Sequence, residues 1–186
     1  MLLKEVFHFF KNPVYEEDEN TDLTYRMGIL KTLLLYSLLF SFILGMLLVF
    51  LETGFDLDLG QHAVDEFLSK YPPFFFLFAA VILAPLIEET FFRAPMIFFK
   101  GHRSFPVMFY LITLLFGFMH LANFKLNTTI ILLSPVLVAP QLCVGVFLGF
   151  IRVRFGLLWS MGLHAFYNLI LIGPALALHL LESPIP

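Results

Sequence analysis

Five apolar segments, each close to the length that a helix needs to cross a lipid bilayer, constrain the fold of this chain most strongly. A transmembrane helix needs about 20 consecutive and mainly apolar residues. The segments are residues 29–51, 73–99, 106–124, 130–151 and 155–181. They predict an all-α, polytopic membrane helix bundle with about five transmembrane helices. Pro135 and Pro140 lie inside the fourth segment, so we expect that helix to be kinked or split.

The composition agrees with a membrane protein and excludes several other classes. The chain has 186 residues, of which 60% are hydrophobic and 13% are charged. A soluble domain is about half apolar and about a quarter charged, and a domain of this size cannot bury the difference. The net charge of −3 provides no basic surface for nucleic acid. The single cysteine, Cys143, excludes an internal disulfide framework and a cysteine-built zinc cluster.

Lysine and arginine gather on one side of the predicted bundle, and this bias sets the orientation of a membrane protein. That side includes the N-terminal segment and the loops after the second and fourth apolar segments, and it holds Lys4, Lys11, Arg26, Lys31, Lys100, Arg103, Arg152 and Arg154. The other side holds Lys70 and Lys125. We therefore expect a cytoplasmic N-terminus. Residues 1–28 are then a cytoplasmic segment that could begin with a short interfacial helix, and residues 29–186 form the transmembrane bundle.

Three ionisable residues lie inside the second apolar segment, namely Glu88, Glu89 and Arg93. An ionised side chain at the bilayer centre costs about 2.5–3.5 kcal/mol, and such residues commonly mark functional sites. Glu89 and Arg93 are four residues apart, so they share a helix face and can neutralise each other. Glu88 is rotated by about 100° and lacks that partner. The alternative is a charged cluster that only pins helices together.

Further polar residues lie in the third and fifth apolar segments. His120 lies near the end of the third, while His164 and Asn168 are four residues apart in the fifth. Alone, His120 would be a hydrogen-bonded packing histidine, and the pair in the fifth segment would join helices. At about 1.5 Å per residue, however, Glu88 and these three residues fall within a slab about 8 Å thick. A shared depth predicts one cavity, because buried polar groups need partners or water.

These residue types suffice for hydrolysis by an activated water. A carboxylate and a histidine can take a proton from water, and an imidazole and an amide can stabilise the oxyanion that forms. Zinc is an open alternative, with Glu88, His120 and His164 as ligands and water at the fourth position. No His-Glu-x-x-His motif makes zinc specific. Ser160 lacks the Gly-x-Ser-x-Gly turn of a nucleophilic serine, so no covalent nucleophile is expected.

Three motifs occur in order on successive apolar segments: Glu-Glu-x-x-x-Arg at Glu88, Glu89 and Arg93, Phe-x-x-x-His at Phe116 and His120, and His-x-x-x-Asn at His164 and Asn168. In this order the chain resembles the CAAX protease and bacteriocin-processing (CPBP, Abi) family of intramembrane proteases. The resemblance covers residues 79–173. It implies a membrane-embedded bundle with an endopeptidase site, and it implies an integral protein of the cytoplasmic membrane, of bacterial type.

The resemblance also implies a role for each matching residue. Glu88 would activate water with help from His120, and His164 and Asn168 would stabilise the oxyanion. Glu89 and Arg93 would support them. The family was long described as metalloendopeptidases, and the present view favours a glutamate mechanism; we therefore expect no cofactor, with zinc as the alternative. The expected partners are the bilayer and a membrane-associated protein or peptide substrate, in CAAX-type processing or in bacteriocin maturation and immunity.

Two other functions are compatible with the same residues. The chain could be a non-catalytic scaffold or regulator that keeps the fold, although a scaffold has no need of all four polar positions. It could also be a proton-coupled carrier that uses Glu88 and the histidines as a relay. Inverted repeats would favour a carrier, and the sequence contains none that we detect.

Overall fold

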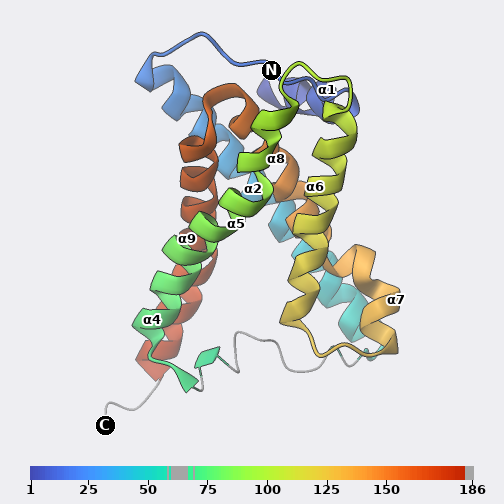
Figure 1. Ribbon diagram of the computed structural model, residues 1–186. Coiled ribbons are helices and arrows are strands. Elements are labelled where there is room, and N and C mark those ends of the chain that lie inside the picture. The colour runs from blue at the N-terminus through green and yellow to red at the C-terminus, as the bar shows by residue number, and fades with distance from the viewer. Residues whose placement is uncertain (58, 60–66, 69, 183–186) are drawn as a thin grey trace.

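The computed structural model describes residues 1–57, 59, 67–68 and 70–182, and the ordered secondary structure within these residues is helical (Figure 1). The elements are α1 (Leu2–Lys11), α2 (Leu23–Gly54), α4 (Pro73–Phe78), η1 (Ala79–Leu83), α5 (Ala84–Phe92), η2 (Ala94–Phe99), α6 (Phe105–Met119), η3 (His120–Asn123), α7 (Thr128–Leu137), α8 (Ala139–Phe155) and α9 (Leu157–Glu182). The predicted all-α class is confirmed.

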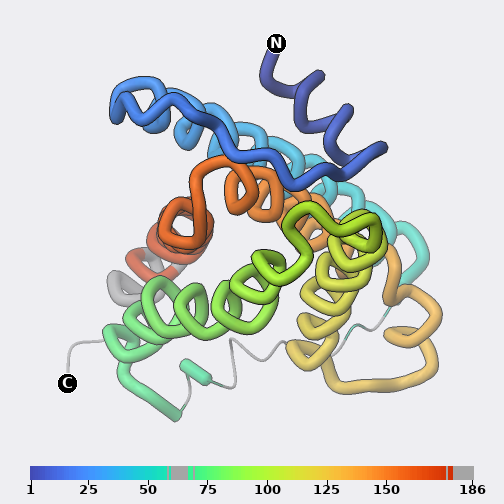
Figure 2. The backbone as a smooth tube through the Cα atoms, turned by 45° about the horizontal axis from the view of Figure 1, so that its top comes forward, coloured from blue at the N-terminus to red at the C-terminus, as the bar shows by residue number. Residues whose placement is uncertain are grey.

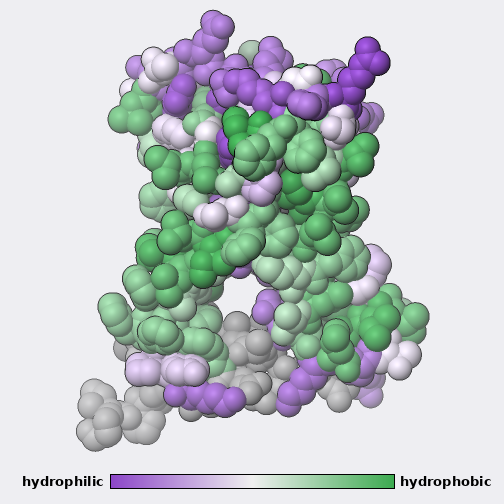
Figure 3. All heavy atoms as spheres, viewed as in Figure 1, coloured by the Kyte–Doolittle hydropathy of each residue, from purple (hydrophilic) through white to green (hydrophobic). Residues whose placement is uncertain are grey.

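Within the described residues, five stretches are long and apolar enough to cross a membrane: Leu23–Gly54, Pro73–Phe99, Phe105–Asn123, Thr128–Phe155 and Leu157–Pro174. Each overlaps one of the predicted segments. Figure 3 shows an apolar belt around the middle of the molecule, with hydrophilic residues gathered mainly at the end that carries α1. This distribution is that of an integral membrane protein, because an apolar belt between polar ends matches the layers of a bilayer.

The first and fourth spans differ in detail from the sequence prediction. The first helix begins six residues earlier than residue 29, because the side chain of Asp22 accepts a hydrogen bond from the Tyr25 N–H and caps the helix there. The fourth span is split at Val138 into α7 and α8, as the prolines predicted. The expected loop with Arg152 and Arg154 is wrong. Helix α8 continues to Phe155, and Arg152 is a buried helical residue.

Only Gly156 separates α8 from α9. Its φ is +99°, a backbone conformation that glycine adopts without steric cost, so it permits an abrupt reversal. The reversal packs α9 antiparallel to α8. It also brings the first turns of α9 against the second span, where the two glutamates lie.

Helix α8 is the centre of the bundle, and it packs against α2, α6 and α9 (Figure 2). Its glycines allow α6 to approach closely. A Cβ atom on Gly149 would lie 2.6 Å from the Phe109 ring, and one on Gly145 would lie 3.2 Å from the Thr113 methyl group. Both are therefore helix-packing glycines, since a larger side chain would hold α6 farther from α8.

Helix α1 lies across the end of the bundle at a large angle to the spans (Figure 1). Phe9 packs edge-to-face on Phe109 and Phe150, with ring centroids 4.9 and 5.5 Å apart. The Tyr110 hydroxyl donates a hydrogen bond to the Phe10 carbonyl, at 2.5 Å. The short N-terminal helix that the sequence allowed is therefore present and firmly attached.

Candidate active site

The second span is not a continuous α-helix, and its irregularity decides which backbone groups face the site. Pro85 has no N–H, so the α-helical hydrogen bond to Val81 cannot form. The chain widens into a π turn, η1, in which the Ala84 N–H donates to the Ala79 carbonyl five residues back. In that register the Ala80 carbonyl would need the N–H that Pro85 lacks. The carbonyl of Ala80 is thus free to accept a bond from another helix.

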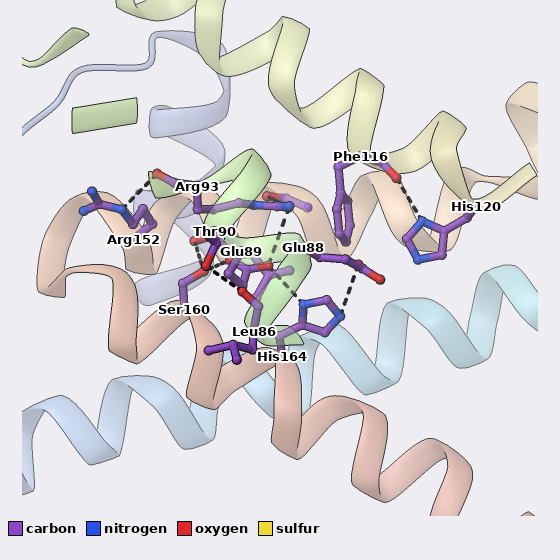
Figure 4. Close-up of polar contacts among 12 residues, drawn as sticks. Leu86, Glu88, Glu89, Thr90, Arg93, Phe116, His120, Arg152, Ser160 and His164 are labelled. Atoms are coloured by element: carbon purple, nitrogen blue, oxygen red, sulfur yellow. Dashed lines mark hydrogen bonds and ion pairs between the residues drawn. The ribbon is translucent and has the colours of Figure 1, made fainter. Parts of the chain in front are cut away.

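Glu89 is fully buried and has a complete set of partners. Its carboxylate accepts a hydrogen bond from the Ser160 hydroxyl, lies 3.0 Å from His164 Nδ1, and lies 3.6 Å from Arg93 Nη1 (Figure 4). The predicted Glu89–Arg93 ion pair is confirmed. Two hydrogen-bond donors of α9 and the Arg93 cation hold this carboxylate, so Glu89 positions its neighbours rather than standing free to react.

The Arg93 side chain is buried, with 1% of its surface exposed, and it contacts several other residues. Its guanidinium lies 3.8 Å from the centroid of the Phe116 ring, and Nη2 donates to the Gly145 carbonyl at 3.4 Å. The Arg93 carbonyl accepts a bond from Arg152 Nε at 3.0 Å, and Arg152 in turn donates to the Tyr15 hydroxyl. A chain of polar contacts therefore runs from the N-terminal segment to the glutamates.

Glu88 differs from its neighbour because it is partly open and lacks a full set of partners. Its side chain is 17% exposed, and its Oε2 lies 3.9 Å from His164 Nε2, too far for a direct hydrogen bond. Oε2 is buried and accepts no hydrogen bond from the described residues. The imidazole of His164 thus stands between the two carboxylates, with Nδ1 on Glu89 and Nε2 toward Glu88 (Figure 4).

His120 enters the site from the end of α6. Its Nδ1 lies 2.9 Å from the Phe116 carbonyl, and Figure 4 shows the ring directed toward the Glu88 carboxylate. The Phe116 ring packs edge-to-face on both imidazoles, with centroids 5.0 Å from His120 and 5.8 Å from His164. Because Phe116 and His120 are one helical turn apart, the Phe116 ring contacts His120 and also reaches His164, and it helps to fix both imidazoles.

Asn168 lies one helical turn beyond His164 on α9. Its Nδ2 donates to the Ala80 carbonyl at 2.8 Å, the group that the π turn leaves free. Asn168 therefore joins α9 to the second span, which is the helix-joining role that the sequence left open. An amide has two N–H groups, so this bond leaves a second donor.

The structure brings together Glu88, Glu89, Arg93, His120 and His164. Asn168 lies one turn beyond His164 on α9, where it contacts Ala80 of η1. Ser160, Arg152 and Tyr15 also belong to the network, and the sequence did not assign them to it. One signal for Ser160 was available, since it precedes His164 by four residues and shares its helix face. Arg152 and Tyr15 gave no signal, because their partners are distant in sequence.

The residues do not form a ready metal site. No group of three His, Cys, Asp or Glu side chains within the described part of the chain converges to hold a metal ion. The zinc alternative requires Glu88, His120 and His164 to meet at one point. The Nδ1 atoms of His120 and His164 face the Phe116 carbonyl and Glu89, so Nε2 is the available ring nitrogen of each histidine. These Nε2 atoms and the Glu88 carboxylate do not converge on one point. We therefore derive no step through a metal.

Figure 3 shows an opening through the half of the molecule remote from α1, between α6 and the paired helices α4 and α9, with hydrophilic atoms at its rim. His120 stands at the end of α6 that borders this opening. Glu88, the partly exposed glutamate, belongs to the span on its other side. The opening therefore lies between the span that carries Glu88 and the helix that ends at His120.

The fold and the cluster define a polytopic membrane protein with two carboxylates and two imidazoles at the meeting point of three spans. A comparison with family models matches residues 70–170 to the type II CAAX prenyl endopeptidase Rce1-like family. The chain belongs to this family of membrane CAAX proteases, as the three motifs predicted. No curated protein and no solved structure matches the chain.

Proposed function

We propose that the protein is an intramembrane endopeptidase in which Glu88 activates the attacking water. The observation that carries this proposal is the contrast between adjacent carboxylates. Glu89 is buried, has two hydrogen-bond donors and forms an ion pair with Arg93, whereas Glu88 is 17% exposed and has a buried oxygen with no hydrogen-bond donor among the described residues. Two carboxylates in such different environments take different roles, and the free one is the base.

In the proposed reaction, water binds between Glu88 and His120. Glu88 takes one proton, and the water oxygen forms a bond to the carbonyl carbon of the scissile peptide. The other hydrogen of the water is accepted by His120 Nε2, which is free because Nδ1 faces the Phe116 carbonyl. When the C–N bond breaks, Glu88 returns its proton to the leaving nitrogen. Atoms balance with water as the only co-reactant.

The oxyanion of this reaction needs donors, and two groups are proposed to supply them. Asn168 has a second N–H beyond the one that holds Ala80. His164 donates through Nδ1 to Glu89, so its Nε2 becomes a donor only when the ring carries a second proton. Nε2 lies 3.9 Å from Glu88 Oε2, so in this proposal the proton that Glu88 takes from water passes to Nε2 while the oxyanion exists and returns to Glu88 before the C–N bond breaks. Both donors act away from bulk water, where such bonds are strongest.

The proposed substrate is a membrane-associated protein or peptide. Family membership favours CAAX-type processing, and bacteriocin maturation or immunity is the second possibility that the motifs indicated. The site lies among membrane-spanning helices, so a substrate must bring its scissile bond into the bilayer. An apolar or lipid-modified segment beside that bond meets this requirement at the lowest desolvation cost.

The test is cleavage by the purified protein in proteoliposomes, with a farnesylated CAAX peptide and its unmodified form as probes and mass spectrometry of the products. Glu88→Gln removes the base and retains the shape, so we expect loss of activity by about 10³-fold or more. Glu19→Gln, at an exposed position in the N-terminal segment, is the matched control and should retain activity. Cleavage by Glu88→Gln at the wild-type rate would falsify the mechanism.

A second arm separates the enzyme from a scaffold. Membranes from cells with the wild-type protein and with Glu88→Gln are compared for new peptide termini. We expect termini that depend on Glu88. If Glu88→Gln supports the full cellular phenotype, the protein acts as a scaffold and the proposal is wrong.

A further inference from the structure

An apolar groove of about 530 Å³ lies on the opposite side of the bundle centre from the glutamates. It is bounded by α1, α2, α6 and α8, and its walls include Leu3, Phe7 and Phe10 of α1, Phe40 of α2, Leu114 of α6 and Cys143 of α8. The groove does not belong to the site described above. On α8, Gly145 contacts Arg93 on one face, while Cys143 and Val146 line the groove on another.

Helix α1 forms one wall of the groove, and part of its own apolar surface is not buried by the rest of the protein. At about 100° per residue, Leu3, Phe7 and Phe10 form one stripe along α1. These side chains are 39%, 56% and 42% exposed, whereas Val6 and Phe9, on the neighbouring face, are buried. The stripe faces the groove and the surroundings of the bundle, so something apolar must complete its burial.

A basic edge runs beside this stripe. Lys4 and Lys11 are seven residues apart and lie about 80–100° around the helix from Leu3, between the apolar stripe and the polar face. The Lys11 ammonium lies 4.5 Å from the centroid of the Phe7 ring, and Phe7 lines the groove. A positive charge is therefore held at the mouth of an apolar cavity, at the end of the molecule where basic residues are concentrated.

We propose that this groove binds one acyl chain of an anionic phospholipid from the leaflet on the α1 side, with the lipid phosphate at Lys11 and Lys4. The chain supplies the apolar surface that the stripe lacks, and the phosphate complements the basic edge. The groove is preformed, because Tyr110 and Phe9 fix α1 on the bundle, so binding does not have to order the helix. The lipid is a bound component of the protein and is separate from the substrate.

The first experiment fills the groove in the full-length protein. Leu114 lines it and is 48% exposed, so Leu114→Trp adds bulk without entering the core. Leu115, the next residue on α6, is 53% exposed and does not line the groove, so Leu115→Trp is the matched control. The proteins are incubated with phosphatidylglycerol in detergent, and bound lipid is counted by native mass spectrometry. We expect about tenfold less bound lipid for Leu114→Trp and no change for the control.

The second experiment tests the basic edge. Replacing both Lys4 and Lys11 by Gln should abolish the preference for phosphatidylglycerol over phosphatidylcholine, and raised salt should weaken that preference in the wild type. Lys31→Gln, which removes an exposed lysine of α2, is the control. Circular dichroism confirms that each variant is folded.

Two results would overturn the proposal. One is equal lipid retention by Leu114→Trp and Leu115→Trp, which would place the lipid elsewhere. The other is displacement of the phospholipid by a farnesylated peptide at equal concentration, which would make the groove a substrate-binding surface. Neither result bears on Glu88, so failure here is distinguishable from failure of the proposed catalytic function.

Discussion

The half of the bundle next to α1 contains the main cluster of buried core residues, and the other half contains fewer buried residues. The buried residues of α2 are Leu30, Leu33, Ser37 and Ser41, all in its first two thirds, while α4 and η1 contain no buried residue. Glu89 and Arg93 are buried, whereas the Glu88 side chain is 17% exposed and His120 lies at the end of α6 that is remote from α1. The buried Glu89 and Arg93 have each other and further hydrogen-bond or aromatic partners, whereas Glu88 Oε2 accepts no hydrogen bond from the described residues.

The largest expected effect compares the two adjacent glutamates. Glu89→Gln leaves the buried Arg93 guanidinium without its counter-charge, so we expect a loss of about 3–5 kcal/mol in the free energy of unfolding. Glu88→Gln should change stability by less than about 1 kcal/mol, because its side chain has no close ion pair. Thermal unfolding in detergent, followed by circular dichroism, measures both. Equal shifts would show that the two carboxylates have the same environment.

The second effect concerns Asn168, whose helix-joining role would affect stability and whose proposed oxyanion role would affect kcat. We expect Asn168→Ala to lower kcat by roughly 10²–10³-fold, because an oxyanion donor is lost. Ser41→Ala is the control, since it removes a hydrogen bond between α2 and Tyr167 of α9 outside the site. It should cost about 1 kcal/mol of stability and leave kcat unchanged. If Asn168→Ala affects only stability, then it joins helices and does nothing more.

The third effect tests the packed half directly. A side chain at Gly149 overlaps the Phe109 ring, so Gly149→Leu should lower the free energy of unfolding by about 1–3 kcal/mol. Gly45 lies in the loosely packed part of α2, and a Cβ atom there meets nothing within 4 Å. Gly45→Leu should therefore have little effect in the same thermal unfolding experiment. A similar loss at both positions would contradict the contrast between the halves.

The smallest effect is that of Arg93→Lys. The charge remains, but the contact of Nη2 with the Gly145 carbonyl and the flat stacking on Phe116 are lost. We expect a loss of about 1 kcal/mol in stability and a modest fall in the cleavage rate. An unchanged melting temperature would mean that the guanidinium contacts contribute nothing to the fold.

Much of the architecture was predictable because a membrane-spanning helix needs a long apolar segment, which is visible in the sequence alone. Apolar length located all five spans, and the prolines of the fourth span indicated its split at Val138. Spacing along a helix also predicted the Glu89–Arg93 pair, since residues four apart share a face. The expected cytoplasmic N-terminus, the roles of Glu88, His120, His164 and Asn168, and the choice between water and zinc chemistry remain predictions that the experiments above and metal analysis of active protein test.

The sequence by itself determined where the apolar segments and the charged residues lie. Helical spacing also determined which residues share a helix face, because that depends only on their separation along the chain. Contacts between distant segments were decided by the tertiary structure. Ser160 reaches Glu89 because a single glycine reverses the chain, Asn168 meets Ala80 because a proline opens the second span, and Arg152 is buried against a backbone carbonyl. Such partners follow from how helices pack, and packing geometry is a property of the whole bundle.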